Sequence, residues 1–175
     1  MYSTPPVSGG IIAIGEAPGD NEDRQGEGFC GIAGKTLDRL LSYHEITRED
    51  YGRANICRCR PPENRKPRRA EIDACLPYLK EFLQQHKASV ILAVGGTPAN
   101  VFYSSGTLTS IIAHAKHRRY VPEVDWAGGA LVVPMPHTSP LAWNRRMPNG
   151  DQWRKAGLEQ VQEAVRLYKR ANKKA

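Results

Sequence analysis

Short apolar runs bracketed by glycine and proline constrain the fold of this chain more than any other feature. Ile11–Ile14 lies between glycines, and Ser89–Val94 runs into a glycine pair, as strands buried on both faces do. Two further strands are predicted from similar signals, Ala54–Cys57 and Ala130–Val133. Segments between and after the strands are predicted to be helices, mostly because their apolar residues recur at helical spacing. They cover 33–43, 69–86, a stretch from Thr97 onward and 151–170. This alternation predicts an α/β fold with a mostly parallel sheet covered by helices on both faces.

The segments between these elements are predicted to be loops. Residues 1–9 are rich in proline, serine and glycine and are expected to form a loose N-terminal arm. Prolines and basic residues argue against regular structure over 60–69, and Pro134–Pro140 is expected to be a rigid turn. The stretch 104–130 mixes glycines with basic residues and is expected to be a hairpin or a long loop. Thr97 is expected to cap a helix whose first residue is proline.

The length and composition are those of one globular domain over residues 1–175. No apolar run approaches the length of a membrane span, and the first residues lack the basic and apolar regions of a signal peptide. We therefore expect a cytoplasmic monomer without a membrane partner.

The charge points to a polyanionic partner. The formal net charge is +7 and the isoelectric point is about 9.4. A basic run is usually a solvated face, but three loop-borne clusters favour binding to nucleic acid. The clusters are Arg53, Arg58, Arg60, Arg65, Lys66, Arg68 and Arg69; Lys116, His117, Arg118 and Arg119; and Arg145 with Arg146.

The loop Gly15–Gly19 follows the first predicted strand directly. Two glycines around a proline favour a tight turn, and open α/β sheets place their ligand sites at the carboxyl ends of strands. Glu16 is therefore a candidate for chemistry, although a loop carboxylate is more often a solvated cap.

An aromatic residue stands among glycines a little further on. Phe29 lies between Gly28 and Gly31, just ahead of a helical pattern. A ring flanked by small residues can offer its face to a flat ligand. The alternative is a core phenylalanine at a helix entry.

Taken together, these motifs resemble a known family. The sequence reads GEAPG at 15–19, ED-x-x-G at 22–26 and F-x-G-x-A-G at 29–34, followed by Asn55, Cys-Arg-Pro-Pro at 59–62 and His137. This combination is similar to the uracil-DNA glycosylase superfamily, particularly the family-four branch of thermophiles and many bacteria. The resemblance implies a three-layer α/β/α sandwich with a four-stranded central sheet, and a DNA partner that carries uracil in single or double strands.

The resemblance also implies the roles of the site residues. Phe29 would stack on uracil flipped out of the DNA, Asn55 would read its N3/O4 edge, and His137 would donate to O2. Gly15, Ala17 and Glu22 would line the pocket. Ala17 stands where the best-known branch has its aspartate, so Glu16 is assigned to positioning or activating water and to balancing the cation, and Glu22 or Asp23 could also line the pocket.

The segment 137–142 resembles the loop that presses into the minor groove. Leu141 is the expected wedge for the gap that the flipped nucleotide leaves, and Ser139 belongs to the same loop. Arg145, Arg146 and Arg65 are expected to bind flanking phosphates. Thr138 stands where the family commonly has proline, which affects the expected rigidity of the loop.

The chain has four cysteines, which are better read as thiols or metal ligands than as disulfides. Cys59 and Cys75 match two ligands of the family-four iron–sulfur cluster, whose other two normally come from an upstream C-x-x-C that this sequence lacks. Cys57 and Cys30 complete the count, and the resemblance places Cys30 near the base pocket. We expect free thiols rather than an intact cluster, and chemistry that requires no cofactor.

Three interpretations of the function remain open. The first is a monofunctional uracil-DNA glycosylase of base excision repair, or a relative that removes another deaminated or modified base; Asn55 favours uracil. The second, suggested by Ala17 and the absent cysteine pair, is a catalytically weak module that binds uracil or damaged DNA. The third is an enzyme acting on free nucleosides, which would not need three basic clusters.

Overall fold

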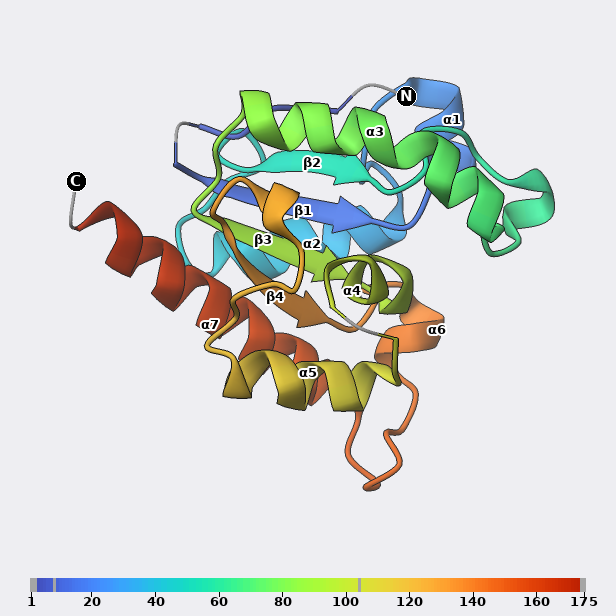
Figure 1. Ribbon diagram of the computed structural model, residues 1–175. Helices are drawn as coiled ribbons and strands as arrows, with labels where there is room; N and C mark the ends of the chain where they lie inside the picture. Colours follow the sequence, from blue (N-terminus) through green and yellow to red (C-terminus); the bar gives the residue numbers. More distant parts are fainter. Residues whose placement is uncertain (1–2, 8, 104, 174–175) are drawn as a thin grey trace.

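A parallel sheet forms the centre of the protein (Figure 1). The computed structural model describes residues 3–7, 9–103 and 105–173. The strands lie in the order β2-β1-β3-β4, and each neighbouring pair is parallel. They are β1 (Ile11–Gly15), β2 (Gly52–Asn55), β3 (Val90–Val94) and β4 (Leu131–Met135). The predicted four-stranded parallel sheet is confirmed.

The longer helices form a layer on each face of the sheet. From β1 the chain moves to one edge of the sheet to form β2, and it then moves in the opposite direction to form β3 and β4. Because each connection is right-handed, the helices before and after this reversal cover opposite faces of the sheet. α2 (Ile32–Ser42) lies behind the sheet in Figure 1 and contacts α7 (Trp153–Asn172). The other layer contains α3 (Arg69–Gln85), α4 (Gly96–Phe102) and α5 (Leu108–His117). The three-layer α/β/α sandwich is confirmed.

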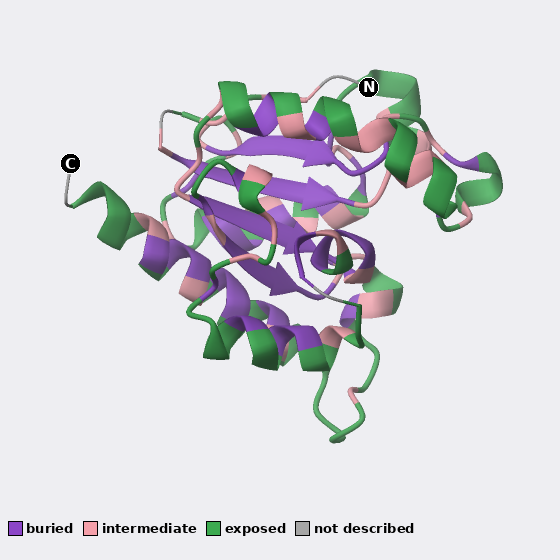
Figure 2. Cartoon of the chain, in the orientation of Figure 1, coloured by how far each residue is buried: buried purple, intermediate pink, exposed green. Residues whose placement is uncertain are grey.

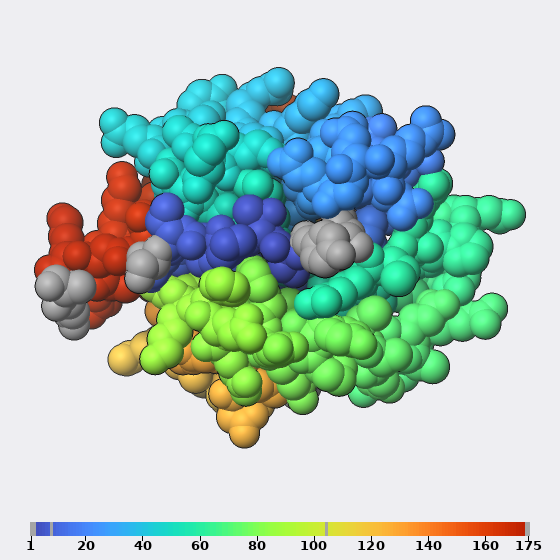
Figure 3. Space-filling model, turned by 90° about the horizontal axis from the view of Figure 1, so that it is seen from above, coloured from blue at the N-terminus to red at the C-terminus, as the bar shows by residue number. Residues whose placement is uncertain are grey.

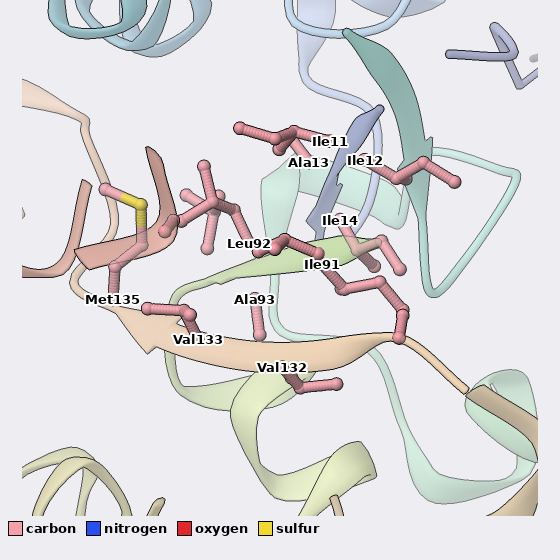
Figure 4. Close-up of a cluster of buried hydrophobic side chains, with 14 of the residues drawn as sticks. Ile11, Ile12, Ala13, Ile14, Ile91, Leu92, Ala93, Val132, Val133 and Met135 are labelled. Carbon is pink, nitrogen blue, oxygen red and sulfur yellow. The ribbon is translucent and has the colours of Figure 1, made fainter. Parts of the chain in front are cut away.

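The core lies between these layers and is built on the central strands. All five residues of β1 and all five of β3 are buried, because helices cover both faces (Figure 2). Ile12, Ile91 and Val132 are paired across neighbouring strands and are each 0% exposed. Their side chains belong to the cluster drawn in Figure 4, and each buried residue of this kind stabilises the fold by about 1.5–3 kcal/mol.

The second strand begins earlier than predicted and holds the N-terminal arm. It runs from Gly52 to Asn55 rather than from 54 to 57. The expected loose arm is bonded to it: Thr4 and Arg53 exchange two backbone hydrogen bonds, of 2.8 and 2.9 Å. A Cβ at Gly52 would come within 2.8 Å of the Pro6 nitrogen, so glycine permits this contact. In Figure 3 the dark-blue arm lies between the cyan segment before β2 and the green helix α3; residues 1, 2 and 8 lie outside the description.

The prediction of a hairpin or long loop over 104–130 was wrong. The segment contains α5 and a short 3-10 helix, η2 (Asp125–Ala127). The Thr107 hydroxyl caps α5 by accepting from the Ser110 backbone N–H at 3.2 Å. Ile111 and Ala115 bury one face of the helix, which packs on β4. The glycines flanking the segment concealed this amphipathic pattern.

Three short elements also lie in predicted loops. They are α1 (Asp20–Gln25), η1 (Pro62–Asn64) and α6 (Pro140–Trp143). α4 begins at Gly96 with Gly95 as its N-cap, so Thr97 is not the cap and Pro98 is not the first helical residue. None of the helices in the described ranges is long and apolar enough to cross a membrane.

A helical glycine sets the contact between α6 and α7. A Cβ at Gly157 of α7 would clash with the ring of Trp143 of α6 and lie 3.2 Å from Pro136 Cγ. We expect Gly157→Ala to lower the free energy of unfolding by roughly 1–3 kcal/mol, because this overpacking outweighs alanine's better helix propensity. Urea unfolding measures the change.

Gly96→Ala in α4 is the matched control, because no heavy atom of the described residues beyond its neighbours lies within 4 Å of the added Cβ. Equal unfolding midpoints for the two variants would contradict the packing argument.

Candidate active site

A cavity of about 320 Å³ opens at the carboxyl edge of the sheet. Gly15 ends β1, Asn55 ends β2, and His137 follows β4, so three parallel strands deliver residues to one place. Its lining includes seven residues predicted for the base pocket, but neither Cys30 nor Asp23: Gly15, Glu16, Ala17, Glu22, Phe29, Asn55 and His137.

Gly15 allows an amide and a phenyl ring to converge. It pairs with Asn55 in the parallel ladder, and Asn55 is 8% exposed. A Cβ at Gly15 would clash with Asn55 Oδ1 and lie 3.0 Å from Phe29 Cζ. Any side chain here would therefore push apart the two groups that line the cavity.

The backbone of Phe29 is held in the left-handed region, with φ of 57°. This conformation costs a residue other than glycine roughly 1 kcal/mol or more. A Cβ at Gly34 would clash with the Phe29 carbonyl, so α2 can begin beside it only because Gly34 has no side chain. Phe29 itself is 8% exposed.

Glu16 and Glu22 have different surroundings. The Thr97 hydroxyl donates to Glu16 Oε2, and no described residue donates to Oε1. Glu22 instead accepts the Gly31 backbone N–H at 2.7 Å and the Gly19 N–H at 3.2 Å, one on each oxygen. Glu22 therefore joins two loops of the pocket, while Glu16 keeps an oxygen for a ligand or water. Asp23 is exposed and does not line the cavity.

Thr97 was missed as a site residue. It is 6% exposed and lies in the first turn of α4, after the carboxyl end of β3. The pattern Gly-Gly-Thr at a strand end was the available signal, but we interpreted the threonine as a helix cap. Its hydroxyl fixes the orientation of a carboxylate instead.

His137 presents one defined tautomer to the cavity. The Ser139 backbone N–H donates to His137 Nδ1 at 3.1 Å, so the proton of the neutral ring lies on Nε2. Burial lowers the pKa of His137, and the carboxylates of Glu16 and Glu22 oppose part of that shift. At neutral pH the ring is thus an uncharged donor.

The family model of the uracil DNA glycosylase superfamily matches residues 2–162. The chain belongs to this superfamily. The match spans all four strands and all the residues that line the cavity. The resemblance inferred from the sequence motifs is confirmed.

Within this superfamily, the chain is similar to proteins of the type-4 branch. The type-4 uracil-DNA glycosylase of Thermotoga maritima is 35% identical over 160 residues, which are 91% of this chain and 78% of the relative. That of Archaeoglobus fulgidus is 33% identical over 138 residues, 78% of this chain and 69% of the relative. That of Saccharolobus solfataricus is 45% identical over 86 residues, 49% and 40% of the two chains.

The loop after His137 carries an exposed apolar residue four positions beyond that histidine. Leu141 of α6 is 79% exposed. Thr138, in place of the family's proline, donates its hydroxyl to the Ala33 carbonyl at 2.7 Å, which ties the loop to α2. Arg145 and His137 both line a second hollow of about 210 Å³. Arg146 donates to the Gly150 carbonyl at 2.8 Å.

The residues of the predicted basic clusters have different roles in the structure. Arg53 is 7% exposed and donates to the Arg48 and Tyr51 carbonyls, so it stabilises the fold. Arg65 is paired with Glu71 at 2.6 Å and does not line the cavity. Lys116 and Arg119 border a different groove between α5 and α7. The sequence pattern did not distinguish structural arginines from exposed ones.

The cysteines of the described residues do not form a cluster site. Burial and the neighbouring Cys75 raise the pKa of Cys57 to about 12, and Cys59 is exposed. Cys30 is not among the lining residues of the cavity. An iron–sulfur cluster of this class needs four ligands, and no three His, Cys, Asp or Glu residues in the described part could hold a metal together. The described residues therefore do not by themselves supply the ligand set of such a cluster.

The surroundings of His137 predict a pH dependence of stability. Its pKa is lower in the folded state, so on acidification the unfolded chain takes up the proton first. The stability that the neutral ring contributes is complete above the unfolded pKa and is lost as pH falls toward the folded pKa. We expect the wild type to lose more unfolding free energy between pH 7 and pH 5 than His137→Gln. Equal losses in urea titrations would show that this histidine is not buried in its neutral form.

Proposed function

We propose that the protein is a monofunctional uracil-DNA glycosylase. It hydrolyses the N-glycosidic bond of uracil flipped out of DNA and leaves an abasic site for base excision repair. The observation that carries the proposal is the convergence of Phe29, Asn55 and His137 on one cavity in a chain of this superfamily. A base fits such a site because the cavity offers a ring face, an amide and a hydrogen-bond donor.

Recognition of uracil rests on the amide and the ring. Uracil presents a donor at N3 beside an acceptor at O4, and the Asn55 side chain can match both in one orientation. Phe29 stacks on the pyrimidine from the side of Gly15, where no Cβ intervenes. Cytosine reverses the donor and acceptor, so the amide orientation that matches uracil would leave cytosine unmatched.

Bond cleavage depends on stabilising the departing base. As the C1′–N1 bond breaks, its electron pair passes to uracil and charge develops on O2. His137 Nε2–H donates to that oxygen, because the Ser139 N–H fixes the other ring nitrogen as an acceptor. A neutral donor suits this step, since its proton stays on the protein while the anion leaves.

Water then attacks the cationic sugar carbon. Glu16 orients the water through its Oε1, since Oε2 is engaged by the Thr97 hydroxyl. The carboxylate also balances the positive charge of the sugar, and it takes up the water proton as the new C1′–O bond forms. Glu22, with both oxygens bonded to backbone N–H groups, supports the loops rather than the water.

The DNA duplex lies over the loop that follows β4. Leu141 fills the space left by the flipped nucleotide, because it is a large apolar side chain with 79% exposure, four positions after His137. Ser139, Arg145 and Arg146 contact the backbone close to the site, and Arg65 does so at a distance. We place the enzyme as a monomer in the cytoplasm, in association with the nucleoid where its substrate lies.

The proposal is tested with a labelled oligonucleotide that carries one uracil. Alkali should cleave the strand at the uracil position after incubation with the protein, and without alkali the strand should stay intact. Retention in a gel shift with no alkali-labile site would indicate a binding module. Release of hypoxanthine or a modified base but not uracil would identify another base, and activity on deoxyuridine but not on DNA would favour a nucleoside enzyme.

Two substitutions test the residues assigned to the base. We expect His137→Ala and Asn55→Ala each to reduce the single-turnover rate on uracil DNA by roughly 10²–10³, because each removes a hydrogen bond to the base. Circular dichroism should show both variants folded. Unchanged rates in both would remove this assignment of the site.

The hydroxyl beside Glu16 generates a separate prediction. Thr97→Val keeps the shape of the side chain but removes the donor, and we expect a single-turnover rate lower by roughly tenfold with little change in DNA affinity. Thr97→Ser retains the hydroxyl and should retain most of the rate. Equal rates for the valine and serine variants would mean that orientation of Glu16 does not depend on this bond.

A further inference from the structure

The strained backbone at the stacking residue has a dedicated hydrogen-bond partner. Arg48, in the segment between α2 and β2, donates through Nη1 to the Phe29 carbonyl at 3.0 Å and through Nη2 to the Gly28 carbonyl at 2.9 Å. One guanidinium thus donates hydrogen bonds to two consecutive peptide carbonyls, next to the residue whose φ is 57°.

The guanidinium is itself held in place from two sides. Glu27 accepts from Arg48 Nη2 at 2.8 Å and from Nε at 3.2 Å. Both oxygens of Asp38, in α2, lie within 3.2 Å of Nη1. The Tyr51 hydroxyl also donates to Asp38, and Tyr51 is fully buried. The planar fork is therefore held by two carboxylates, one of which, Asp38, belongs to a packed helix.

This network accounts for a conformation that the sequence alone disfavours. No glycine supplies the left-handed residue at position 29, so the conformation persists only where neighbouring groups impose it. Gly34 leaves room for the Phe29 carbonyl, and Arg48 provides the attraction. If the backbone relaxed, the ring would rotate away from Gly15 and the cavity would lose its stacking face.

We propose that Arg48 is a positioning residue for base recognition, which sets the plane of the Phe29 ring by holding the carbonyls of residues 28 and 29. The inference rests on the proposed function, since the ring is taken to stack on uracil. Arg48 does not touch the base, because it is not among the residues that line the cavity.

The role is separated from general stabilisation by two binding measurements. The inhibition constant of free uracil, a product of the reaction, depends on the Phe29 ring. The affinity for DNA with an abasic site depends on the rest of the binding surface. We expect Arg48→Ala to raise the inhibition constant of uracil by roughly tenfold, on the scale of one stacked base. Its affinity for abasic-site DNA should stay within about twofold of the wild type.

Conservative variants keep the test valid if Arg48→Ala does not fold. Arg48→Lys keeps the charge but loses the planar fork, and Asp38→Asn weakens the anchor of the guanidinium. Both should weaken uracil binding without a matching loss of abasic-site binding. Arg166→Ala is the matched control, because Arg166 makes a similar two-point contact with Glu163 on α7, away from the cavity.

A double-mutant cycle isolates the coupling to the ring. In a Phe29→Ala background there is no ring to position, so adding Arg48→Ala should change uracil inhibition by less than about twofold. Additive losses, or equal losses of uracil and abasic-site affinity, would overturn the proposal and leave Arg48 as a structural residue only.

A spectroscopic readout does not depend on activity. The protein has three phenylalanines, so 4-fluorophenylalanine labelling should yield three fluorine resonances. Arg48→Lys should shift or broaden the Phe29 resonance and leave those of Phe82 and Phe102 unchanged. Three unchanged resonances would overturn the proposal. A wild type that releases no uracil would reject the proposed function, whereas the fluorine result would still decide whether Arg48 positions the ring.

Discussion

The parallel pairing of β1 with β2 is the constraint on which the cavity depends. It places Gly15 opposite Asn55 at the last step of the ladder, and the missing Cβ lets the amide and the Phe29 ring approach the same space. The parallel arrangement of β3 and β4 brings Thr97 and His137 to the same edge. A sheet of this topology thus brings Gly15, Asn55 and His137, which are distant along the chain, to one edge.

The loops around the cavity are held by hydrogen bonds between side chains and backbone. Glu22 joins the backbone at Gly19 and Gly31, and Thr138 binds the Ala33 carbonyl. Arg48 grips residues 28 and 29. These hydrogen bonds hold the loops around the cavity in fixed positions. The bonds made by Glu22 and Arg48 are charge-assisted and of a kind that contributes about 1.5–3 kcal/mol each, and those of Arg48 offset the strain at Phe29.

Sequence patterns predicted the fold well wherever the pattern was strong and local. Continuous apolar runs identified the strands, and glycine or proline marked their ends. The stretch 104–130 was predicted wrongly, because its glycines and basic residues hid the apolar face that α5 buries on β4. The base pocket could be assigned because its residues lie in motifs of a known family. Thr97 and Arg48 lie outside the quoted motifs, and only their partners reveal what they do.

The sequence by itself determined the strand–helix alternation and the chemistry available to the site: a carboxylate, an amide and an imidazole after strands, and a phenyl ring ahead of a helix. These follow from local preferences and from the hydrophobic burial that apolar runs require. The tertiary structure alone decided which charged groups were free. Arg53, Arg65 and Arg48 are alike in sequence, yet the first supports the backbone, the second pairs with Glu71 and the third grips two peptide carbonyls. The reason is physical: a guanidinium takes its role from the acceptors within about 3 Å, and chain folding, rather than sequence proximity, brings those acceptors near.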